Sequence, residues 1–252
     1  MNTMNPKSKD FLLAVEGLTV SFDGFKAVDD LSFYLEPKEI RVIIGPNGAG
    51  KTTVLDLICG KTRASSGSIK FAGKELTKLK EHQIVHSGVG RKFQTPSVFE
   101  DLTVFENLEV SYPKGHSVAG ALAFKRDKVV IEAVEAVAET IFLTDALNES
   151  AASLSHGQKQ WLEIGMLLIQ KPDLLMLDEP VAGMSVAERK KTAELLKVIT
   201  RDHTVLVIEH DMQFVGDIAD RVTVMHQGKV LSEGAIEHVK SDPKVIEVYL
   251  GH

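Results

Sequence analysis

Short apolar runs alternate with segments of helical length in the second half of the chain. The runs 174–177, 205–208 and 222–225 are almost wholly apolar. Such runs are typical of strands that are buried on both faces, and the segment 186–200 between the first two has the length of a helix. The pattern therefore predicts an α/β fold in which helices cover both faces of a mostly parallel core sheet.

Two other parts of the chain follow different patterns. Residues 12–35 alternate apolar and polar positions around breaks at Gly17 and Gly24, which predicts a pair of antiparallel strands. From residue 96 to about residue 153, apolar positions recur at helical spacing with few strand signals. We therefore expect an antiparallel β subdomain near the N-terminus and a helical insertion at 96–153.

These parts are expected to belong to a single domain of 252 residues, which is long enough to bury one substantial core. The core would comprise residues 11–95 and 154–252, with the helical subdomain 96–153 between them. Residues 1–10 contain no apolar core of their own, and we expect them to form a disordered tail rather than a signal peptide.

The overall composition excludes several classes of protein. The net charge of −6 gives the chain no general attraction to nucleic acid, so we expect no nucleic-acid partner. Cys59 is the only cysteine, so the chain forms no internal disulfide and suits a reducing compartment; we expect it to be buried. Because no apolar run approaches the roughly 20 residues needed to span a bilayer, we expect a cytoplasmic protein.

A glycine-rich stretch lies between the apolar run 40–44 and an apolar helical segment. Its glycines allow successive backbone N–H groups to point at an anion, and the helix that follows adds donors and the positive end of its dipole. Lys51 would bridge the β- and γ-phosphates, and the Thr52 hydroxyl would ligate Mg²⁺. This context predicts a nucleoside triphosphate site formed by Gly45, Pro46, Asn47, Gly48, Ala49, Gly50, Lys51, Thr52 and Thr53.

Two carboxylates, Asp178 and Glu179, end the apolar run 174–177. Acidic pairs after strands often serve as helix caps. Here the strand would deliver both groups to the carboxyl edge of the sheet, where ligands bind in this architecture. Neighbours point in opposite directions, so one carboxylate can hold Mg²⁺ while the other polarises an attacking water.

The stretch 154–158, Leu-Ser-His-Gly-Gln, precedes an amphipathic helix that contains Trp161, which we expect to be a packing residue. Ser155 and Gln158 have the spacing of a capping box, which explains the stretch structurally. Gly157, however, weakens the first turn by roughly 0.8–1 kcal/mol relative to alanine. A glycine here indicates that something, such as an anion at the helix N-terminus, approaches the backbone closely.

Together these motifs resemble the ATP-binding subunits of ABC transporters, over nearly the whole chain from Leu12 to Leu250. In this resemblance residues 45–52 are the Walker A loop, and 174–178 are the Walker B strand with Glu179 as catalytic base. Residues 154–158 are the signature. Gln94 fits the Q-loop, and His210, just after an apolar strand, fits the switch histidine.

The resemblance implies a P-loop NTPase fold of the ABC type, with ATP and Mg²⁺ as ligands. Two subunits, either identical or paralogous, would pack head to tail, with each ATP between the Walker A loop of one and the signature of the other. The signature residues facing ATP would be Ser155, His156, Gly157 and Gln158. Phe22 would stack on adenine with Ala27 beside the base. Glu179, His210 and Gln94 would be catalytic, and Thr52, Gln94 and Asp178 would ligate the metal.

Two positions depart from the family pattern. His156 stands in the signature where glycine is most common, although Ser155 and Gly157 remain. Residues 180–185, which correspond to the D-loop, end in Ser185 where aspartate is usual. The effect of Ser185 on coupling across the dimer is left open by the sequence.

The subtype rests on three stretches, 90–100, 154–164 and 178–184, which look like the urea-type ATPase related to branched-chain amino acid importers. This resemblance implies integral membrane permease subunits, an indirect link to a solute-binding protein outside the membrane, and a location on the inner face of the cell membrane. The alternatives are the ATPase of a lipid or lipopolysaccharide exporter, a soluble ABC-type ATPase acting in cluster assembly or on the ribosome, and a scaffold that binds ATP without turnover.

Overall fold

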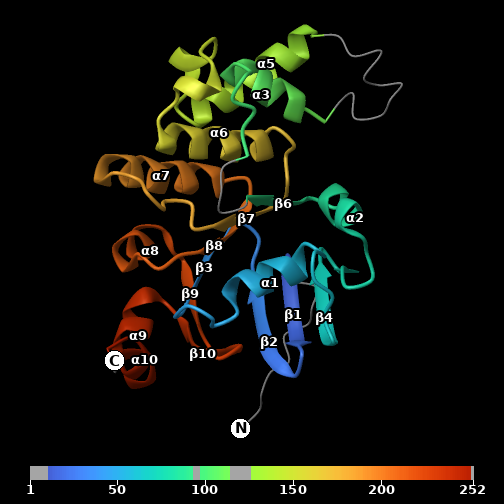
Figure 1. Cartoon of the computed structure of the whole chain (residues 1–252), viewed down its shortest axis with the longest axis vertical. Helices are drawn as coiled ribbons and strands as arrows, with labels where there is room; N and C mark the ends of the chain where they lie inside the picture. The colour runs from blue at the N-terminus through green and yellow to red at the C-terminus, as the bar shows by residue number, and fades with distance from the viewer. Residues whose placement is uncertain (1–10, 93–96, 114–125, 251–252) are drawn as a thin grey trace.

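The polypeptide forms two β-sheets in one half of the molecule and a layer of helices in the other (Figure 1). The computed structural model describes residues 11–92, 97–113 and 126–250. The expected tail at 1–10 and the candidate residue Gln94 therefore lie outside the described residues.

A six-stranded sheet has the spatial order β10-β9-β3-β8-β7-β6. All neighbouring strands pair in parallel except β10, which runs antiparallel to β9 at one edge. The mostly parallel core sheet predicted from the sequence is confirmed. Its strands are β3 (Ile40–Ile44), β6 (Val89–Lys92), β7 (Leu174–Asp178), β8 (Thr204–Ile208), β9 (Arg221–His226) and β10 (Lys229–Gly234).

The central strands of this sheet are buried on both faces. In β3, Val42 and Ile44 pack into one hydrophobic core, whereas Ile43 between them packs into the other. Because side chains alternate across a strand, one apolar run serves both cores. The helix α1 (Lys51–Ile58) contributes to the core that contains Ile43, and α6 (His156–Leu168) and α7 (Val186–Ile199) contribute to the core on the opposite face.

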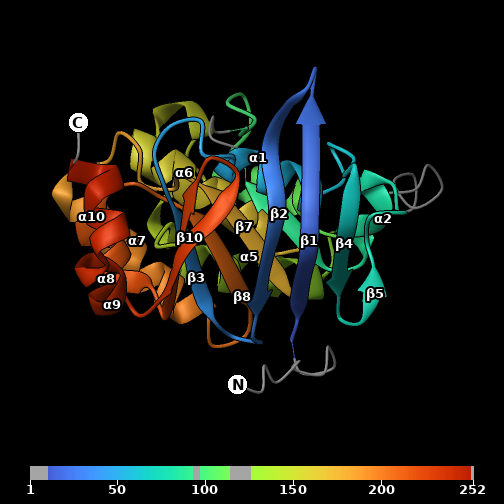
Figure 2. The ribbon, with the colours of Figure 1, turned by 90° about the horizontal axis from the view of Figure 1, so that it is seen from below.

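A second, antiparallel sheet encloses the core that contains α1 (Figure 2). Its spatial order is β2-β1-β4-β5, from β1 (Leu13–Phe22), β2 (Phe25–Leu35), β4 (Ser66–Phe71) and β5 (Lys74–Glu75). The long pair β1–β2 is the one predicted at 12–35. The helix α2 (Glu81–His86), which leads into β6, was not predicted, because Ile84 is its one buried residue and gives no apolar stripe.

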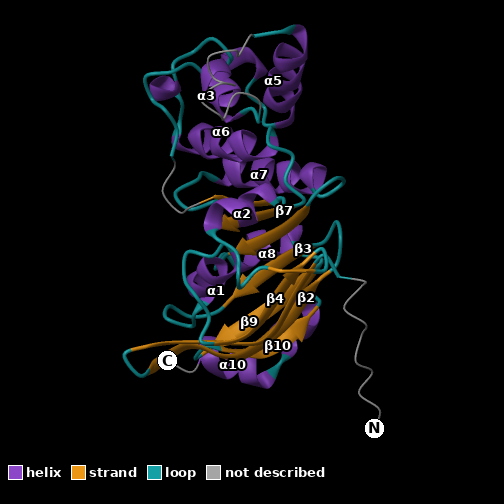
Figure 3. Ribbon diagram, turned by 90° about the vertical axis from the view of Figure 1, so that its right-hand side faces the viewer, coloured by secondary structure: helices purple, strands orange, loops and turns teal. Residues whose placement is uncertain are grey.

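The described part of the insertion consists of helices and turns, which Figure 3 shows at the end of the molecule away from the strands. α3 (Val104–Ser111) begins at a capping box in which Thr103 and Glu106 each bond the other's backbone N–H. Also present are α5 (Lys128–Thr140) and the single turns η1 (Thr144–Ala146) and η2 (Ala151–Ser153). Both α3 and α5 pack on α6. The subdomain boundaries at 96 and 153 stay a prediction.

Three further helices lie in the C-terminal part of the described chain: α8 (Met212–Ile218) connects β8 to β9, whereas α9 (Ile236–Ser241) and α10 (Pro243–Leu250) follow β10. The last two were not predicted from the sequence. Within residues 11–92, 97–113 and 126–250, no helix is long and apolar enough to cross a membrane.

A buried ion pair joins the core sheet to the helical layer. Lys92 Nζ, at the end of β6, lies 3.3 Å from Glu163 Oε2 on α6. Burial lowers the pKa of Lys92, and the negative charge of Glu163 opposes this shift. Burial likewise raises the pKa of Glu163, and the positive charge of Lys92 opposes that shift. Glu163 also accepts a hydrogen bond from the backbone N–H of Ser97. One carboxylate on α6 thus holds residues on both sides of the segment 93–96.

Candidate nucleotide site

The Walker A loop connects the carboxyl end of β3 to the first turn of α1. Gly50 immediately precedes α1 in the left-handed conformation, with φ of 97°. A Cβ atom on Gly50 would lie 2.3 Å from the carbonyl oxygen of Ala27 in β2, so a side chain cannot be placed there without moving the backbone. The loop therefore leads directly into a helix N-terminus, which is the arrangement that binds phosphate in proteins.

The outer part of this loop faces open space. Asn47 and Gly48 are exposed, and a Cβ atom on Gly48 would have no neighbouring atom within 4 Å. Ala49 is buried beneath them, with Pro46 and Thr53 half-buried on either side. An anion can therefore approach the backbone of the loop from solvent.

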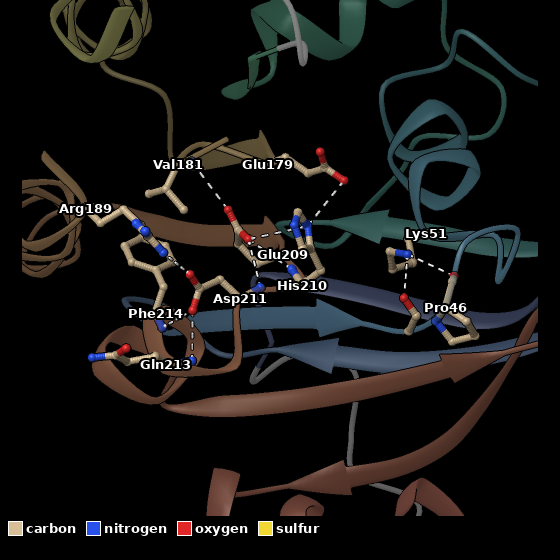
Figure 4. Close-up of polar contacts among 11 residues, drawn as sticks. Pro46, Lys51, Glu179, Val181, Arg189, Glu209, His210, Asp211, Gln213 and Phe214 are labelled. Carbon is tan, nitrogen blue, oxygen red and sulfur yellow. Dashed lines mark hydrogen bonds and ion pairs between the residues drawn. The ribbon is translucent and has the colours of Figure 1, made fainter. Parts of the chain in front are cut away.

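The Lys51 side chain folds back over the loop, where its Nζ donates hydrogen bonds to Gly45 O at 2.7 Å and Pro46 O at 3.0 Å (Figure 4). Burial lowers the pKa of this ammonium, and the charges of Glu179 and Asp178 counteract the shift. Lys51 is thus a cation held at the loop by carbonyl oxygens, which a phosphate oxygen can replace as its partners.

Asp178 is the last residue of β7 and is 5% exposed. Burial raises the pKa of this carboxyl group, whereas the charge of Arg91 and a hydrogen bond from the Thr52 side chain oppose the rise. Asp178 and Thr52 thus place a carboxylate and a hydroxyl, both hard oxygen ligands of the kind Mg²⁺ prefers, next to each other.

Metal binding at this position needs oxygen atoms from elsewhere. Among the residues that the structure describes, no group of three or more His, Cys, Asp or Glu is arranged to hold a metal ion. Mg²⁺ keeps several waters and binds through one or two protein ligands together with substrate phosphates. Thr52 and Asp178 fit that pattern, with nucleotide phosphates supplying the rest. Gln94, the third predicted ligand, lies outside the described residues.

Glu179 leaves the sheet in a left-handed turn with φ of 48°, and its backbone N–H donates to Ile208 O at 3.0 Å. Its Oε1 atom lies 3.7 Å from Nδ1 of His210, which follows β8 (Figure 4). The Glu179 side chain is 25% exposed and the His210 side chain 65% exposed. The carboxylate can therefore reach a water molecule at the mouth of the site, with the largely exposed imidazole beside it.

Glu209 is a residue of this site that the sequence analysis missed. Its carboxylate accepts the backbone N–H of Val181 at 3.4 Å and that of His210 at 2.9 Å. Burial raises its pKa, and these hydrogen bonds act in the opposite direction. Glu209 thus ties the turn that carries His210 to the start of the D-loop. The sequence does contain a signal that could have identified Glu209: it follows a wholly apolar run, as Asp178 and Glu179 do.

The two residues predicted beside the base belong to the antiparallel sheet. Phe22 ends β1 and is 47% exposed, whereas Ala27 is buried in β2. The carbonyl oxygen of Ala27 is the group against which Gly50 packs. The first part of β2 therefore adjoins the Walker A loop, and the exposed ring of Phe22 lies at the end of the neighbouring strand β1.

The signature belongs to the helical layer and lies apart from α1 (Figure 1). Ser155 caps α6, and its Oγ accepts from Gln158 N at 3.2 Å while Gln158 Oε1 accepts from Ser155 N at 2.8 Å. Ser155 and His156 are exposed, Gln158 is half-buried and Gly157 is buried. The structure therefore brings together Lys51, Thr52, Asp178, Glu179 and His210, but not the signature.

Two further expectations have clear outcomes. Trp161 is a packing residue, as predicted: it is 4% exposed, and its Nε1 donates to Thr192 Oγ1 at 2.9 Å. The expectation that Cys59 is fully buried is wrong. It is half-buried, and its Sγ accepts a hydrogen bond from Arg91 Nη1 at 3.1 Å. The thiol follows α1 at the edge of the hydrophobic core that contains this helix, where it also contacts Arg91.

Comparison with known proteins agrees with this geometry. The family model of the ABC transporter ATP-binding domain, described as ABC transporter, matches residues 28–182. The chain is 39% identical over 251 residues to the high-affinity branched-chain amino acid transport ATP-binding protein BraF of Pseudomonas aeruginosa, covering 95% of this chain and 98% of that protein. It is 40% identical to LivG of Salmonella typhimurium, of the same description, with the same coverage.

Solved structures give the same result. A crystal structure of the ADP conformation of an ATP-binding cassette of an ABC transporter has a TM-score of 0.84 and 31% identity, covering 96% of this chain and 99% of that chain. A nucleotide-free ATP-binding cassette of an ABC transporter also has a TM-score of 0.84, with 30% identity and coverage of 96% and 100%. The chain belongs to the ABC transporter family as an ATP-binding subunit. It is a P-loop enzyme that hydrolyses ATP in transport.

The contact at Gly50 gives a test of the loop geometry. Gly50→Ala should destabilise the fold and abolish nucleotide binding, because its Cβ atom meets the Ala27 carbonyl. Gly48→Ala is the matched control: it also has a positive φ, 79°, but faces open space, so it should cost only the conformational strain of about 1–3 kcal/mol. Urea denaturation and titration with Mg-ATP measure both effects. Equal stability of the two variants would contradict the loop geometry.

Proposed function

We propose that this chain hydrolyses ATP between two head-to-tail subunits and thereby drives uptake of a small polar solute through a membrane permease. The observation that carries the proposal is the meeting of Lys51, Thr52, Asp178, Glu179 and His210 at the carboxyl edge of one sheet. The charges and positions of these groups support the roles in phosphoryl transfer that we propose for them.

Within one subunit the groups divide the work. Lys51 leaves its two carbonyl partners to bind the β- and γ-phosphates, while the N–H groups of the Walker A loop hold the phosphate oxygens. Thr52 and Asp178 would hold Mg²⁺, which neutralises charge on the phosphates when bound. Glu179 acts as general base for the attacking water, and His210 orients it and contacts the γ-phosphate. Gln94 is proposed to complete the metal and water contacts.

The second subunit supplies the remaining donors. Ser155, His156 and Gly157 stand at the N-terminus of a 13-residue helix whose dipole favours an anion. In one chain these groups lie away from α1 (Figure 1). We infer that they serve an ATP bound to the Walker A loop of a facing chain, with Phe22 of that same facing chain stacked on the adenine at about 0.5–1.5 kcal/mol. The facing chain is a second copy or a paralogue.

The surface proposed to receive the permease lies beside the segment 93–96. Asn107 is buried, and its side chain bonds Phe99 N at 2.8 Å and Phe99 O at 3.0 Å, which folds the preceding turn so that Phe99 remains 51% exposed. A cavity of about 640 Å³ is lined by residues of α2 and β6, on the other side of the segment 93–96 in the sequence, and of α6, and these residues include Val85, Arg91 and Leu167. An apolar segment of a permease fits such a surface, which would place this chain on the inner face of the cell membrane.

The proposed solute is urea or a related small polar compound. The stretches 90–100, 154–164 and 178–184 support urea by their resemblance to the urea-type ATPase. A branched-chain amino acid is the second candidate, since the relatives at 39% and 40% identity are described as ATP-binding proteins of branched-chain amino acid transport. The solute does not pass through this chain, so the choice depends on the permease and the solute-binding protein.

Glu179→Gln tests the proposed general base. The variant should bind ATP as the wild type does, because it keeps Lys51 and the Walker A loop, but its turnover should fall at least 100-fold because an amide cannot accept the water proton. ATP should then hold the subunits as a dimer, which gel filtration with light scattering detects. Steady-state hydrolysis at the wild-type rate would remove Glu179 from the mechanism.

Reconstitution with the membrane subunits tests the solute. In vesicles that contain the complete transporter and its binding protein, labelled urea should accumulate in an ATP-dependent manner. Labelled leucine in matched vesicles is the control. Uptake of leucine without uptake of urea would assign the chain to amino acid transport, and efflux of a lipid would contradict uptake altogether.

A further inference from the structure

One carboxylate joins the signature to the D-loop of the same chain. Glu188, in the first turn of α7, accepts a hydrogen bond from Ser155 Oγ at 3.1 Å through its Oε1 atom. Its other oxygen, Oε2, accepts from Ser185 N at 2.9 Å and from Ser185 Oγ at 2.7 Å. These hydrogen bonds, chiefly those from Ser185, lower the pKa of Glu188, so the group is an anion at neutral pH.

The same carboxylate lies directly against the backbone of Gly157. A Cβ atom on Gly157 would lie 2.4 Å from Glu188 Oε1. Glu188 also accepts a hydrogen bond from the backbone N–H of Gly157. The sequence indicated that an anion approaches the backbone at this helix N-terminus, and in the isolated chain that anion is the chain's own Glu188.

Both departures from the family pattern take part in this arrangement. Ser185, in place of the usual aspartate, donates twice to Glu188 and begins α7 with a capping box. His156, in place of the usual glycine, has its Nε2 atom 3.1 Å from Ala182 O in the D-loop. An aspartate at 185 would instead place a second negative charge beside Glu188. The two unusual residues thus fasten the signature to the D-loop.

We propose that Glu188 is a positioning residue whose carboxylate holds, in the free chain, the place that a phosphate oxygen of the facing ATP takes in the dimer. The inference rests on the proposed function, because it assumes that Ser155 and Gly157 serve an ATP bound to a second subunit. It adds a residue on α7 that competes with that ATP.

Competition follows from the charges and the donors. The hydroxyl of Ser155 and the N–H of Gly157 cannot serve the Glu188 carboxylate and a phosphate at once, and the two anions repel each other. Formation of the dimer must therefore move Oε1 away from the signature, while Oε2 keeps its bonds to Ser185. Glu188 raises the ATP concentration needed to close the dimer and leaves nucleotide binding by the chain's own Walker A loop unchanged.

The decisive experiment uses the Glu179→Gln chain, in which bound ATP is not consumed. Glu188→Gln is added to it, because glutamine keeps the size of the side chain and serves equally well in the capping box but carries no charge. The ATP concentration for half-maximal dimerisation should fall about three- to tenfold, the change expected when a charge-assisted hydrogen bond no longer has to be broken. Glu194→Gln, an exposed carboxylate on the same helix, is the matched control and should change nothing.

Two further measurements separate the possible failures. ADP affinity should be the same in all of these chains, and an unchanged or raised ATP midpoint in the Glu188→Gln chain would overturn the proposal.

If ATP does not dimerise the Glu179→Gln chain at all, the proposed function fails for the homodimer. Hydrogen exchange in the free chain then decides: Glu188→Ala should speed exchange of the Gly157 amide at least threefold, and unchanged exchange would remove the contact on which the inference depends.

Discussion

Parallel pairing of three buried strands is the constraint on which the nucleotide site depends. In the sheet, Ile208 of β8 pairs with Ile43 of β3 on one side and with Asp178 of β7 on the other. The three strands therefore end at nearly the same level of the sheet, β7 and β8 at these residues and β3 one residue later at Ile44. Burial of the apolar runs fixes the register, since a slip by one residue would exchange the two hydrophobic cores.

The charged groups at this edge of the sheet have pKa values set by opposing effects, and nucleotide binding would change one of these effects. Burial raises the pKa of Asp178 and of Glu209, and it lowers the pKa of Lys51, so each group is destabilised in its charged form. Hydrogen bonds and opposite charges act against these shifts. A triphosphate would give Lys51 a stronger partner than its two carbonyls, and a bound cation would do the same for Asp178.

Local patterns predicted the elements and motifs because each depends on residues close in sequence. The apolar runs of β7 and β8, the glycines around Lys51 and the capping box of Ser155 and Gln158 are of this kind. Contacts between distant elements were beyond such patterns. The pairs Lys92–Glu163 and Ser155–Glu188 join α6 to β6 and to α7, and nothing in the spacing of these residues indicates that they meet.

The difference between local sequence patterns and contacts of distant elements also explains the errors at single residues. Cys59 packs against the core that contains α1, but it is only half-buried, and Arg91 of β6 reaches its thiol from another element. Glu209 was passed over although it ends an apolar strand as Asp178 does, because its partners are backbone N–H groups that follow from tertiary structure. Gly157 was the exception: its cost to the helix indicated a nearby anion before the structure identified one.

Calorimetric titration of the purified chain with Mg-ATP tests the central claim most directly. The account predicts that the wild-type chain binds one ATP per subunit and that Lys51→Met weakens binding at least tenfold, the loss expected for a hydrogen bond to a charged group. Lys197→Met, at an exposed position on α7, should bind as the wild type does. Equal affinity of the Lys51→Met and wild-type chains would contradict a triphosphate site at this edge of the sheet.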